Sequence, residues 1–341
     1  VLKDVNAFSE HASGVTLRSY QREVAEAVID SVLRQRGLSF VVMFPRQSGK
    51  NELQAQIEAY LLTLLQGRDA ELVKVSPTWK PQSLNAMRRL QRVLERNLLC
   101  RYAWRKESGY IFRVGQARIF FLSGEPGANI VGATANTLLE VDEAQDVLPA
   151  KFDKDINPMA ASTNATRVFW GTAWTGETLL ARELRAAREL ERADGLRRVF
   201  VCSAEQVAKE VPAYGDFVAG QVARLGRNHP MIRSQFYSEE VDGQAGLFTP
   251  ARRALMQGEH MRQSQPSAGR LYAFTLDVAG ESSANSPVSA GGAGLLENPR
   301  RDSTALTIFE IDLSPLADPL LRAPLYRVVE RKLWTGAAHA D

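Results

Sequence analysis

The chain has 341 residues, more than the roughly 300 that one hydrophobic core usually serves, so two domains are expected. Its 45% hydrophobic and 24% charged residues are typical of a globular protein, and a formal net charge of +3 neither requires nor excludes a nucleic-acid partner. No apolar run approaches the ~20 residues of a membrane helix, which argues against a membrane protein. Cys100 and Cys202 lack the CxxC spacing of a zinc site or a disulfide framework, which favours buried thiols in a reducing compartment.

Residues 1–16 show no clear hydrophobic period and are interpreted as an N-terminal arm. Residues 17–211 alternate between short apolar runs typical of buried strands and stretches with helical spacing. The expected strands are 39–44, 71–75, 110–114, 117–122, 137–141, 167–170 and 197–201. The expected helices are 17–36, 53–65, 81–98 and 178–193. Strands that alternate with helices predict an α/β domain with a mostly parallel, helix-covered sheet.

The strand signal fades over residues 212–268, where helical pieces and polar turns indicate a linker or a small lid subdomain. A new pattern occupies residues 269–341. Three strand-like runs follow one another there without long helices between them, which favours an antiparallel meander. The runs are 270–278, 303–311 and 325–334.

The turn Phe44–Asn51 joins an expected strand to an expected helix, which is the setting of a phosphate-binding loop. Gly49 would let the backbone approach an anion, and Lys50 would reach the outer phosphates. The match to G-x-x-x-x-G-K-[ST] is imperfect, because Phe44 replaces the first glycine and Asn51 the hydroxyl residue that binds magnesium. The asparagine carbonyl oxygen can still contact the ion or its water, so this departure bears on metal affinity. The candidate ATP-binding residues of the turn are Arg46, Gln47, Ser48, Gly49, Lys50 and Asn51.

An apolar strand ending in two acids follows some 90 residues later, at Leu138–Glu143. In a phosphate-loop ATPase the aspartate, here Asp142, holds Mg²⁺ directly or through water. The glutamate, here Glu143, orients and deprotonates the attacking water. Glu140 is interpreted as structural. Arg46 could stabilise transition-state charge in cis.

Three further residues have two open interpretations. A tyrosine such as Tyr20 can stack on adenine and a glutamine such as Gln21 can read its edge, although such a pair alone is an ordinary helix surface. Thr172 follows the next strand and would either sense the γ-phosphate or belong to a plain turn.

Two stretches of the sequence are rich in arginine. The arginines of 178–193 favour a salt-bridged face, whereas those of 88–101 have fewer acids beside them and would suit DNA contact better.

Five segments, taken in order, resemble the large terminase subunit of tailed bacteriophages. They are YQ (20–21), PRQSGKNE (45–52), SPTWKPQS (76–83), LLEVDEAQ (138–145) and GTAWTGE (171–177). The RQ-x-GK form of the phosphate loop is characteristic of this family, which normally lacks the first glycine. The resemblance implies an ATP- and Mg²⁺-dependent DNA translocase, with Tyr20 and Gln21 at adenine, Glu143 as catalytic base and Thr172 as coupling residue.

The same resemblance implies a C-terminal nuclease of ribonuclease-H fold that uses Mg²⁺ or Mn²⁺. Asp277 ends the first strand of that part, where the first metal-binding carboxylate belongs. The family's next carboxylates follow the third strand, where this sequence stops, so we expect residues 269–341 to be an incomplete nuclease that does not cleave DNA. One further departure is that no arginine lies between Arg118 and Arg167, where some terminases have a subunit-bridging arginine.

The implied partners are double-stranded DNA, the portal protein and the small terminase subunit, in the cytoplasm of the host cell. No membrane association is expected, and the chain would be a monomer in isolation and a ring on the portal. Three alternatives remain. A metal-dependent DNA nuclease with a vestigial nucleotide site is supported by Asn51. A helicase is opposed by the β-rich C-terminal part, and an inactive prophage remnant is opposed by the intact Lys50, Asp142 and Glu143.

Overall fold

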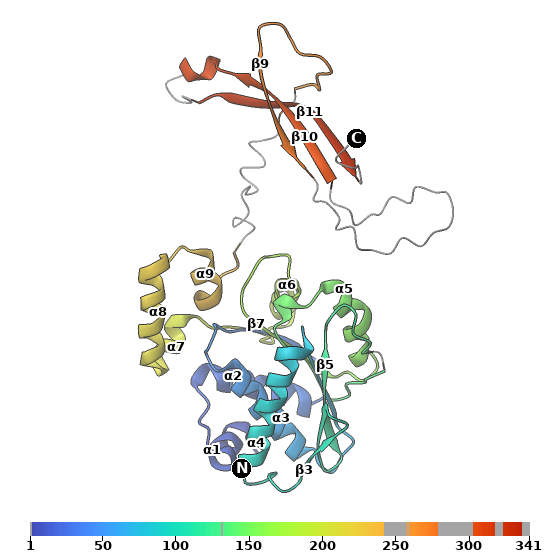
Figure 1. The fold of residues 1–341 in the computed structure, drawn as a ribbon. Helices are drawn as coiled ribbons and strands as arrows, with labels where there is room; N and C mark the ends of the chain where they lie inside the picture. Colours follow the sequence, from blue (N-terminus) through green and yellow to red (C-terminus); the bar gives the residue numbers. More distant parts are fainter. Residues whose placement is uncertain are drawn as a thin grey trace, which may run out of the picture. The chain divides into compact units, whose positions relative to one another are not determined.

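The computed structural model describes residues 2–130, 132–241, 258, 260–278, 303–317 and 323–335. The chain forms two compact units, Val1–Thr249 and Pro250–Asp341 (Figure 1). The phosphate-loop candidates all lie in the first unit, and Asp277 lies in the second.

The first unit is built on an eight-stranded sheet with the order β3-β4-β5-β2-β6-β7-β1-β8. Its strands are β1 (Ser39–Met43), β2 (Glu71–Ser76), β3 (Trp104–Glu107), β4 (Ile111–Val114), β5 (Ala117–Ser123), β6 (Leu138–Val141), β7 (Thr166–Gly171) and β8 (Val199–Val201). From β5 to β8 every neighbouring pair is parallel, while β3 and β4 add an antiparallel edge. The predicted α/β class with a mostly parallel sheet is therefore confirmed.

Helices cover both faces of this sheet, because its strands alternate their apolar side chains between two cores. The helices are α1 (Val5–Ser13), α2 (Ser19–Leu33), α3 (Lys50–Leu64), α4 (Leu84–Arg96), α5 (Pro149–Lys151), α6 (Leu179–Asp194), α7 (Ala204–Glu210), α8 (Pro212–Leu225) and α9 (Pro230–Tyr237). Short helical turns occupy Trp79–Ser83, Ala144–Asp146, Phe152–Ile156 and Asn157–Ala160. One core lies beneath α1–α4, and the other lies beneath α6 and the turns before β7.

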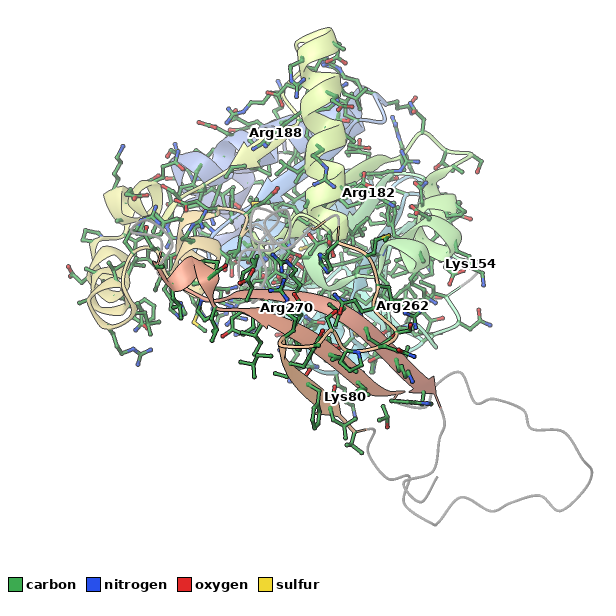
Figure 2. The ribbon with its side chains drawn as sticks, turned by 90° about the horizontal axis from the view of Figure 1, so that it is seen from above. Lys80, Lys154, Arg182, Arg188, Arg262 and Arg270 are labelled. Atoms are coloured by element: carbon green, nitrogen blue, oxygen red, sulfur yellow. The ribbon has the colours of Figure 1, made fainter. Side chains whose placement is uncertain are left out.

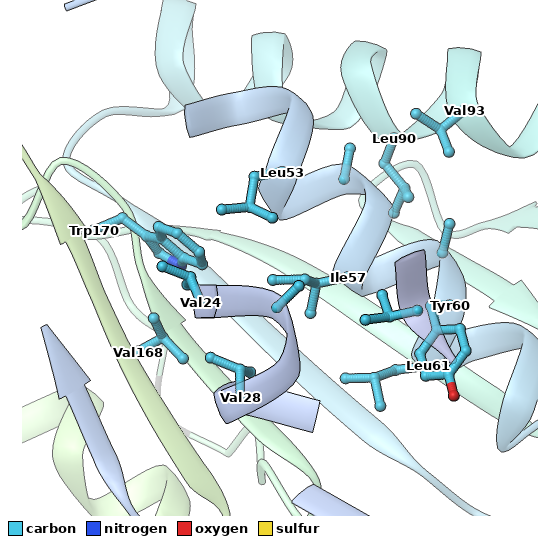
Figure 3. Packing of buried hydrophobic residues seen from close by; sticks show 14 of the residues in the cluster. Val24, Val28, Leu53, Ile57, Tyr60, Leu61, Leu90, Val93, Val168 and Trp170 are labelled. Atoms are coloured by element: carbon cyan, nitrogen blue, oxygen red, sulfur yellow. The ribbon is translucent and has the colours of Figure 1, made fainter. Parts of the chain in front are cut away.

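Helix α3 is buried along almost its whole length. Figure 3 shows Leu53 and Ile57 of α3 between Val24 of α2 and Leu90 of α4, with Trp170 of β7 alongside. A helix enclosed in this way has little freedom to shift, because protein interiors are packed as densely as organic crystals. The residues at its N-terminus are therefore held firmly against the sheet.

The interpretation of residues 1–16 as an arm is corrected by the structure, because α1 is part of the core. Phe8 is fully buried and its ring meets that of Tyr60 edge-on at a centroid distance of 5.3 Å. Asp4 caps the helix by accepting hydrogen bonds from the backbone N–H groups of Asn6 and Ala7, and Gly14 ends it in a left-handed conformation. A helix of nine residues is too short for its period to stand out in the sequence.

The segment 212–268, predicted as one linker or lid, is divided between the two units. Helices α8 and α9 belong to the first unit, where α7, α8 and α9 lie together (Figure 1). Beyond Thr249 the chain belongs to the second unit.

The second unit contains a three-stranded antiparallel sheet with the order β11-β10-β9. Its strands are β9 (Leu271–Asp277), β10 (Ser303–Asp312) and β11 (Leu325–Thr335), and a short helical turn spans Ser314–Ala317. The predicted antiparallel meander is confirmed in these three strands. The assignment of this unit to the ribonuclease-H fold stays a prediction.

Candidate active site

The turn between β1 and α3 forms a compact loop at the N-terminus of a buried helix. Gly49 caps α3 with a φ of 92°, a left-handed conformation that glycine adopts without strain. A Cβ at this position would also lie 2.7 Å from Gln21 Nε2. The first turn of α3 leaves backbone N–H groups without helical partners, which is what a phosphate needs.

Tyr20 and Gln21, the two predicted adenine contacts, both donate hydrogen bonds to backbone oxygens of this loop, and their role at adenine stays a prediction. The Tyr20 hydroxyl donates to Ser48 O at 2.7 Å, and Gln21 Nε2 donates to Gly49 O at 3.0 Å. Gln21 Oε1 accepts from the Arg18 backbone N–H at 2.9 Å, so both ends of this amide are occupied. Arg18, which no sequence pattern singled out, adds a bond from its guanidinium to Ser48 O at 3.0 Å.

The two acids that follow β6 face the loop across β7, the strand that lies between β6 and β1 in the sheet. Lys50 Nζ lies 2.8 Å from Glu143 Oε1, and the Lys50 side chain is only 8% exposed. Glu143 has a φ of 45° and a ψ of 50°, a left-handed conformation that costs a non-glycine residue about 1–2 kcal/mol. Asp142 is buried, and its Oδ1 accepts a hydrogen bond from Gln54 Nε2 at 2.9 Å.

A buried network of charges lies behind Asp142. Gln54 Oε1 accepts from Lys74 Nζ at 2.7 Å, and the same ammonium lies 2.6 Å from Glu58 Oε1. Glu140 completes the network and accepts from the Trp170 indole at 2.8 Å. Burial alone would lower the pKa of Lys74, but the surrounding carboxylates reverse this and raise it above its ordinary value.

Glu140 is a fully buried carboxylate of this network. Burial raises its pKa well above the ordinary range, and the neighbouring Glu58 adds to that effect while Lys74 opposes it. Glu140, which was predicted to be structural, lies fully inside the fold, beneath the candidate metal ligand Asp142. Gln54, Glu58 and Lys74 carried no signal in the sequence, because only the fold brings α3 and β2 to β6.

Thr172 is linked to the acids through Gln145. Gln145 Nε2 donates to Glu143 Oε2 at 2.9 Å, and Gln145 Oε1 accepts from the Thr172 backbone N–H at 3.2 Å. Asp146 lies beside this amide, where burial and the charge of Glu143 raise the pKa of its carboxyl group. Sequence reasoning missed Gln145, although it lies within the segment that resembles terminases.

Most of the predicted site residues line two cavities at the carboxyl end of the sheet. One, of about 370 Å³, is bordered by the loop itself. From the predicted set it gathers Arg46, Gln47, Gly49, Lys50, Asn51, Glu143 and Thr172. The other, of about 340 Å³, adds Asp142. Ser48 lines neither of them, because its hydroxyl is turned inward and donates to Pro45 O at 2.7 Å.

A third cavity, of about 290 Å³, lies beside Tyr20 and Phe44. Its other wall comes from β8 and α7 and includes Phe200 and Cys202. Gln21 does not line it. Charged side chains, among them Glu23, Arg197 and Lys209, border the rest of it. Aromatic rings next to a phosphate loop could stack on a flat heterocycle, while the charged groups would contact its polar edge.

The helices after β8 also contact the phosphate loop. The Arg46 backbone N–H donates to Gln235 O at 2.8 Å, and Arg46 O accepts from the Tyr214 hydroxyl at 2.8 Å. Val241 N also donates to Trp174 O at 2.9 Å, in the loop after β7. The backbone of Arg46 is thus fixed while its side chain is exposed to the cavity.

On the arginine-rich helix α6, the salt bridges that the sequence favoured are found at Arg182. Figure 2 shows Arg182 and Arg188 on this helix. Arg182 makes two hydrogen bonds of 2.8 Å to the Asp153 carboxylate and contacts Glu183 as well. These carboxylates satisfy the guanidinium of Arg182 within the chain.

In the second unit, Asp277 is exposed and lies opposite Ala305 in the pairing of β9 with β10. Within the described part of the chain, no three histidine, cysteine, aspartate or glutamate side chains are grouped as a metal site requires. The metal role of Asp277 therefore stays a prediction. Both cysteines are buried and free, as the sequence indicated, and none of the helices in the described residues is long and apolar enough to cross a membrane.

No protein-family model and no curated protein matches the sequence. Solved structures do match. The large terminase of bacteriophage HK97 matches with a TM-score of 0.57 and 18% identity, over 98% of this chain and 68% of that one. The large terminase ATPase domain of Thermus phage P74-26 matches with a TM-score of 0.53 and 14% identity, over 68% of this chain and 97% of that one. A single-residue mutant of that domain matches with a TM-score of 0.51. At these identities the similarity concerns the fold, and it confirms at that level the resemblance to large terminases that the sequence segments indicated.

Proposed function

We propose that this chain is the ATP-hydrolysing motor subunit of a phage terminase, which translocates double-stranded DNA into a procapsid. The observation that carries the proposal is the meeting of Lys50, Asp142, Glu143 and Thr172 at two adjoining cavities. These residues follow three neighbouring strands of a parallel sheet, β1, β6 and β7. Ligands of open α/β sheets bind at the carboxyl ends of the strands, so this edge is the expected place for a substrate.

The phosphates of ATP would bind the loop and the N-terminus of α3. The helix dipole and the free N–H groups of its first turn favour an anion there. Lys50 would contact the outer phosphates, whose oxygens would compete with the Glu143 carboxylate for its ammonium. The Arg46 side chain lines both cavities and would stabilise the charge that develops on the γ-phosphate.

Asp142 and Asn51 line the same cavity and would hold the Mg²⁺ that accompanies ATP. A carboxylate and an amide carbonyl are oxygen donors of the kind that this ion prefers, so the donor set fits. When bound, the ion would neutralise charge on the β- and γ-phosphates. Asp142 needs no rearrangement to take part, because Gln54 already fixes one of its oxygens.

Glu143 would act as the general base that takes a proton from the attacking water. Its carboxylate borders both cavities, one with Lys50 and the other with Asp142. Thr172 lines both cavities and would report hydrolysis to the loop after β7. The base of the nucleotide would lie beside Tyr20 in the third cavity, while Gln21 would act on the loop rather than on adenine.

The resemblance to terminases supports the remaining parts of the proposal. The subunit would act in the host cytoplasm on double-stranded DNA, with the portal protein and the small terminase subunit, as a monomer that joins a ring on the portal. The exposed arginines of α4 and the loop after it would suit the DNA backbone. They are Arg88, Arg92, Arg96 and Arg101. The second unit would belong to a nuclease that uses Mg²⁺ or Mn²⁺, with Asp277 as a ligand.

The test is phosphate release from Mg-ATP, with and without duplex DNA, by the wild type and Glu143→Gln. We expect turnover by the wild type and a loss of about 100-fold or more in the variant, because general-base catalysis contributes about 10²- to 10⁴-fold. Glu125→Gln, at an exposed carboxylate outside the cavities, is the control and should keep wild-type turnover. A wild type that fails to bind ATP would refute the motor and favour the nuclease alternative, which cleavage of DNA with Mn²⁺ would then test.

A further inference from the structure

The side chain of Gln145 connects the ends of two strands at the candidate active site. Its amide nitrogen donates to Glu143 Oε2 at 2.9 Å and to Asp146 Oδ2 at 3.1 Å. Its amide oxygen accepts from the backbone N–H of Thr172 at 3.2 Å. One side chain thus contacts the proposed base after β6 and the backbone of the loop after β7.

The fold leaves room for this contact by placing a glycine at the end of β7. A Cβ on Gly171 would lie 2.5 Å from Gln145 Oε1 and 2.5 Å from Leu180 Cδ2. Any larger residue would therefore push the amide away from Thr172. The half-buried position of Gln145 also limits the freedom of its side chain.

Only a side chain with a donor and an acceptor at its end can make both contacts. The carboxylate of Glu143 needs a donor, and the backbone N–H of Thr172 needs an acceptor. Glutamate would keep the acceptor but bring a third negative charge beside Glu143 and Asp146. Methionine has nearly the same length and would provide no donor and only a weak acceptor.

We propose that Gln145 is a positioning residue that ties the orientation of Glu143 to the loop after β7, an inference that rests on the proposed ATPase function. Glu143 has two side-chain donors, Lys50 through Oε1 and Gln145 through Oε2. When phosphate oxygens take Lys50, Gln145 remains as the donor that holds the base. The position of the base then follows the position of the Thr172 backbone.

The loop that Gln145 contacts is itself tied to the segment after α9. Trp174 O accepts a hydrogen bond from Val241 N at 2.9 Å, only two residues beyond Thr172. Gln235, two residues before the end of α9, binds the phosphate loop through its backbone oxygen. A shift of the segment after α9 would therefore move the loop after β7, and Gln145 would transmit that shift to the base.

The test compares ATP turnover and nucleotide affinity of the wild type, Gln145→Met and Gln145→Glu. We expect kcat to fall about 10- to 100-fold in Gln145→Met, as when residues that orient a reacting group are lost. The Kd for ATP should stay within about twofold in Gln145→Met, because Gln145 lines the cavity with Asp142 but its side-chain hydrogen bonds go to Glu143, Asp146 and Thr172 rather than to the phosphate loop or Lys50. Gln145→Glu should fall at least as far, although it keeps the acceptor for Thr172. Gln91→Met is the matched control, since Gln91 also donates to a carboxylate, Glu95 Oε1 at 2.8 Å, but on the surface of α4.

A double-mutant cycle with Glu143→Gln separates positioning from a general structural effect. If Gln145 acts through Glu143, adding Gln145→Met to Glu143→Gln will cause little further loss of residual turnover. A full additional loss in the double variant would overturn the inference, as would wild-type kcat in Gln145→Met. The inference would also be contradicted if both substitutions at position 145 lowered kcat equally and both caused a large drop in the thermal midpoint. That result would indicate a general loss of structure. A wild type without turnover would remove the proposed function and this inference together, whereas an active wild type with an active Gln145→Met removes the inference alone.

Discussion

Lys50 and Glu143 are joined by an ion pair of 2.8 Å between the start of α3 and the end of β6. The lysine side chain is 8% exposed and the glutamate 25%, so the pair is only partly screened by water. The proposed phosphate-binding lysine and the proposed general base thus form an ion pair with each other.

Lys50→Met should weaken ATP binding by at least about tenfold, a loss of about 1.4 kcal/mol or more, because it removes the lysine ammonium that lines the cavity at the phosphate loop. Titration with a fluorescent ATP analogue measures this. The matched control is Lys151→Met, because Lys151 is equally buried and lies 2.8 Å from Asp155 Oδ2, away from the cavities. The control should lose stability and keep its affinity; equal weakening in both variants would contradict the assignment.

Lys74→Met should lower the free energy of unfolding by about 3–5 kcal/mol, because it leaves Glu58 and Glu140 buried without their cation. Urea denaturation followed by circular dichroism measures the change. Adding Glu58→Gln should restore a substantial part of the loss, since it removes one of the two carboxylates. A single variant within about 0.5 kcal/mol of the wild type would show that the buried charge is compensated in another way.

Gly49→Ala should impair ATP binding and lower stability by about 1–2 kcal/mol, because alanine is strained at a φ of 92°. The added methyl group would also press on Gln21 Nε2, which supports the loop. Gly195→Ala provides the control, since Gly195 has a φ of 71° and nothing within 4 Å of an added Cβ. Both variants should lose stability in thermal denaturation, and only Gly49→Ala should lose nucleotide affinity.

The thiol of Cys202 should react slowly with thiol reagents in the folded protein. Burial raises its pKa to about 12, so only about one molecule in 10⁴ would carry a thiolate at pH 8. Burial also raises the pKa of Cys100. Titration with a chromogenic disulfide at pH 8 should therefore detect two thiols per chain quickly in denaturant and only slowly without it. One equivalent of fast reaction in native buffer would show that a cysteine is accessible.

The sequence was sufficient where the signal is local. The strands of the first unit have runs of apolar residues, and the turn at Gly49 and Lys50 has its own residue pattern. The pairing of Asp142 with Gln54 could not be predicted, because the two lie 88 positions apart and meet only once β6 is placed beside β2 and α3. The role of Gln21 as a support of the loop was hidden for the same reason, since the pattern that suggested adenine says nothing about which amide contacts are already made.

Short helices and buried charged residues were the other features that the sequence did not predict. The helix α1 has only a few turns, so the burial of Phe8 depends on the surface that Tyr60 offers it. Glu58 and Lys74 are charged residues of the kind usually found on the surface. Nothing in the sequence around either of them indicates that both are buried. Charged residues are buried when they find partners, and those partners come from other elements.

The spacing of Lys50, Gln54 and Glu58 along α3 has a consequence for how the protein can change over generations. The three residues are separated by four positions each, so they follow one side of the helix over about 12 Å. Lys50 contacts Glu143, Gln54 contacts Asp142, and Glu58 contacts Lys74. A replacement of one helix residue leaves its partner in the sheet without this contact. A compensating replacement must then arise at that partner, on a strand or directly after it. We therefore expect these positions to vary in concert among homologues, so that an ancestral reconstruction would recover them as linked steps rather than as independent ones.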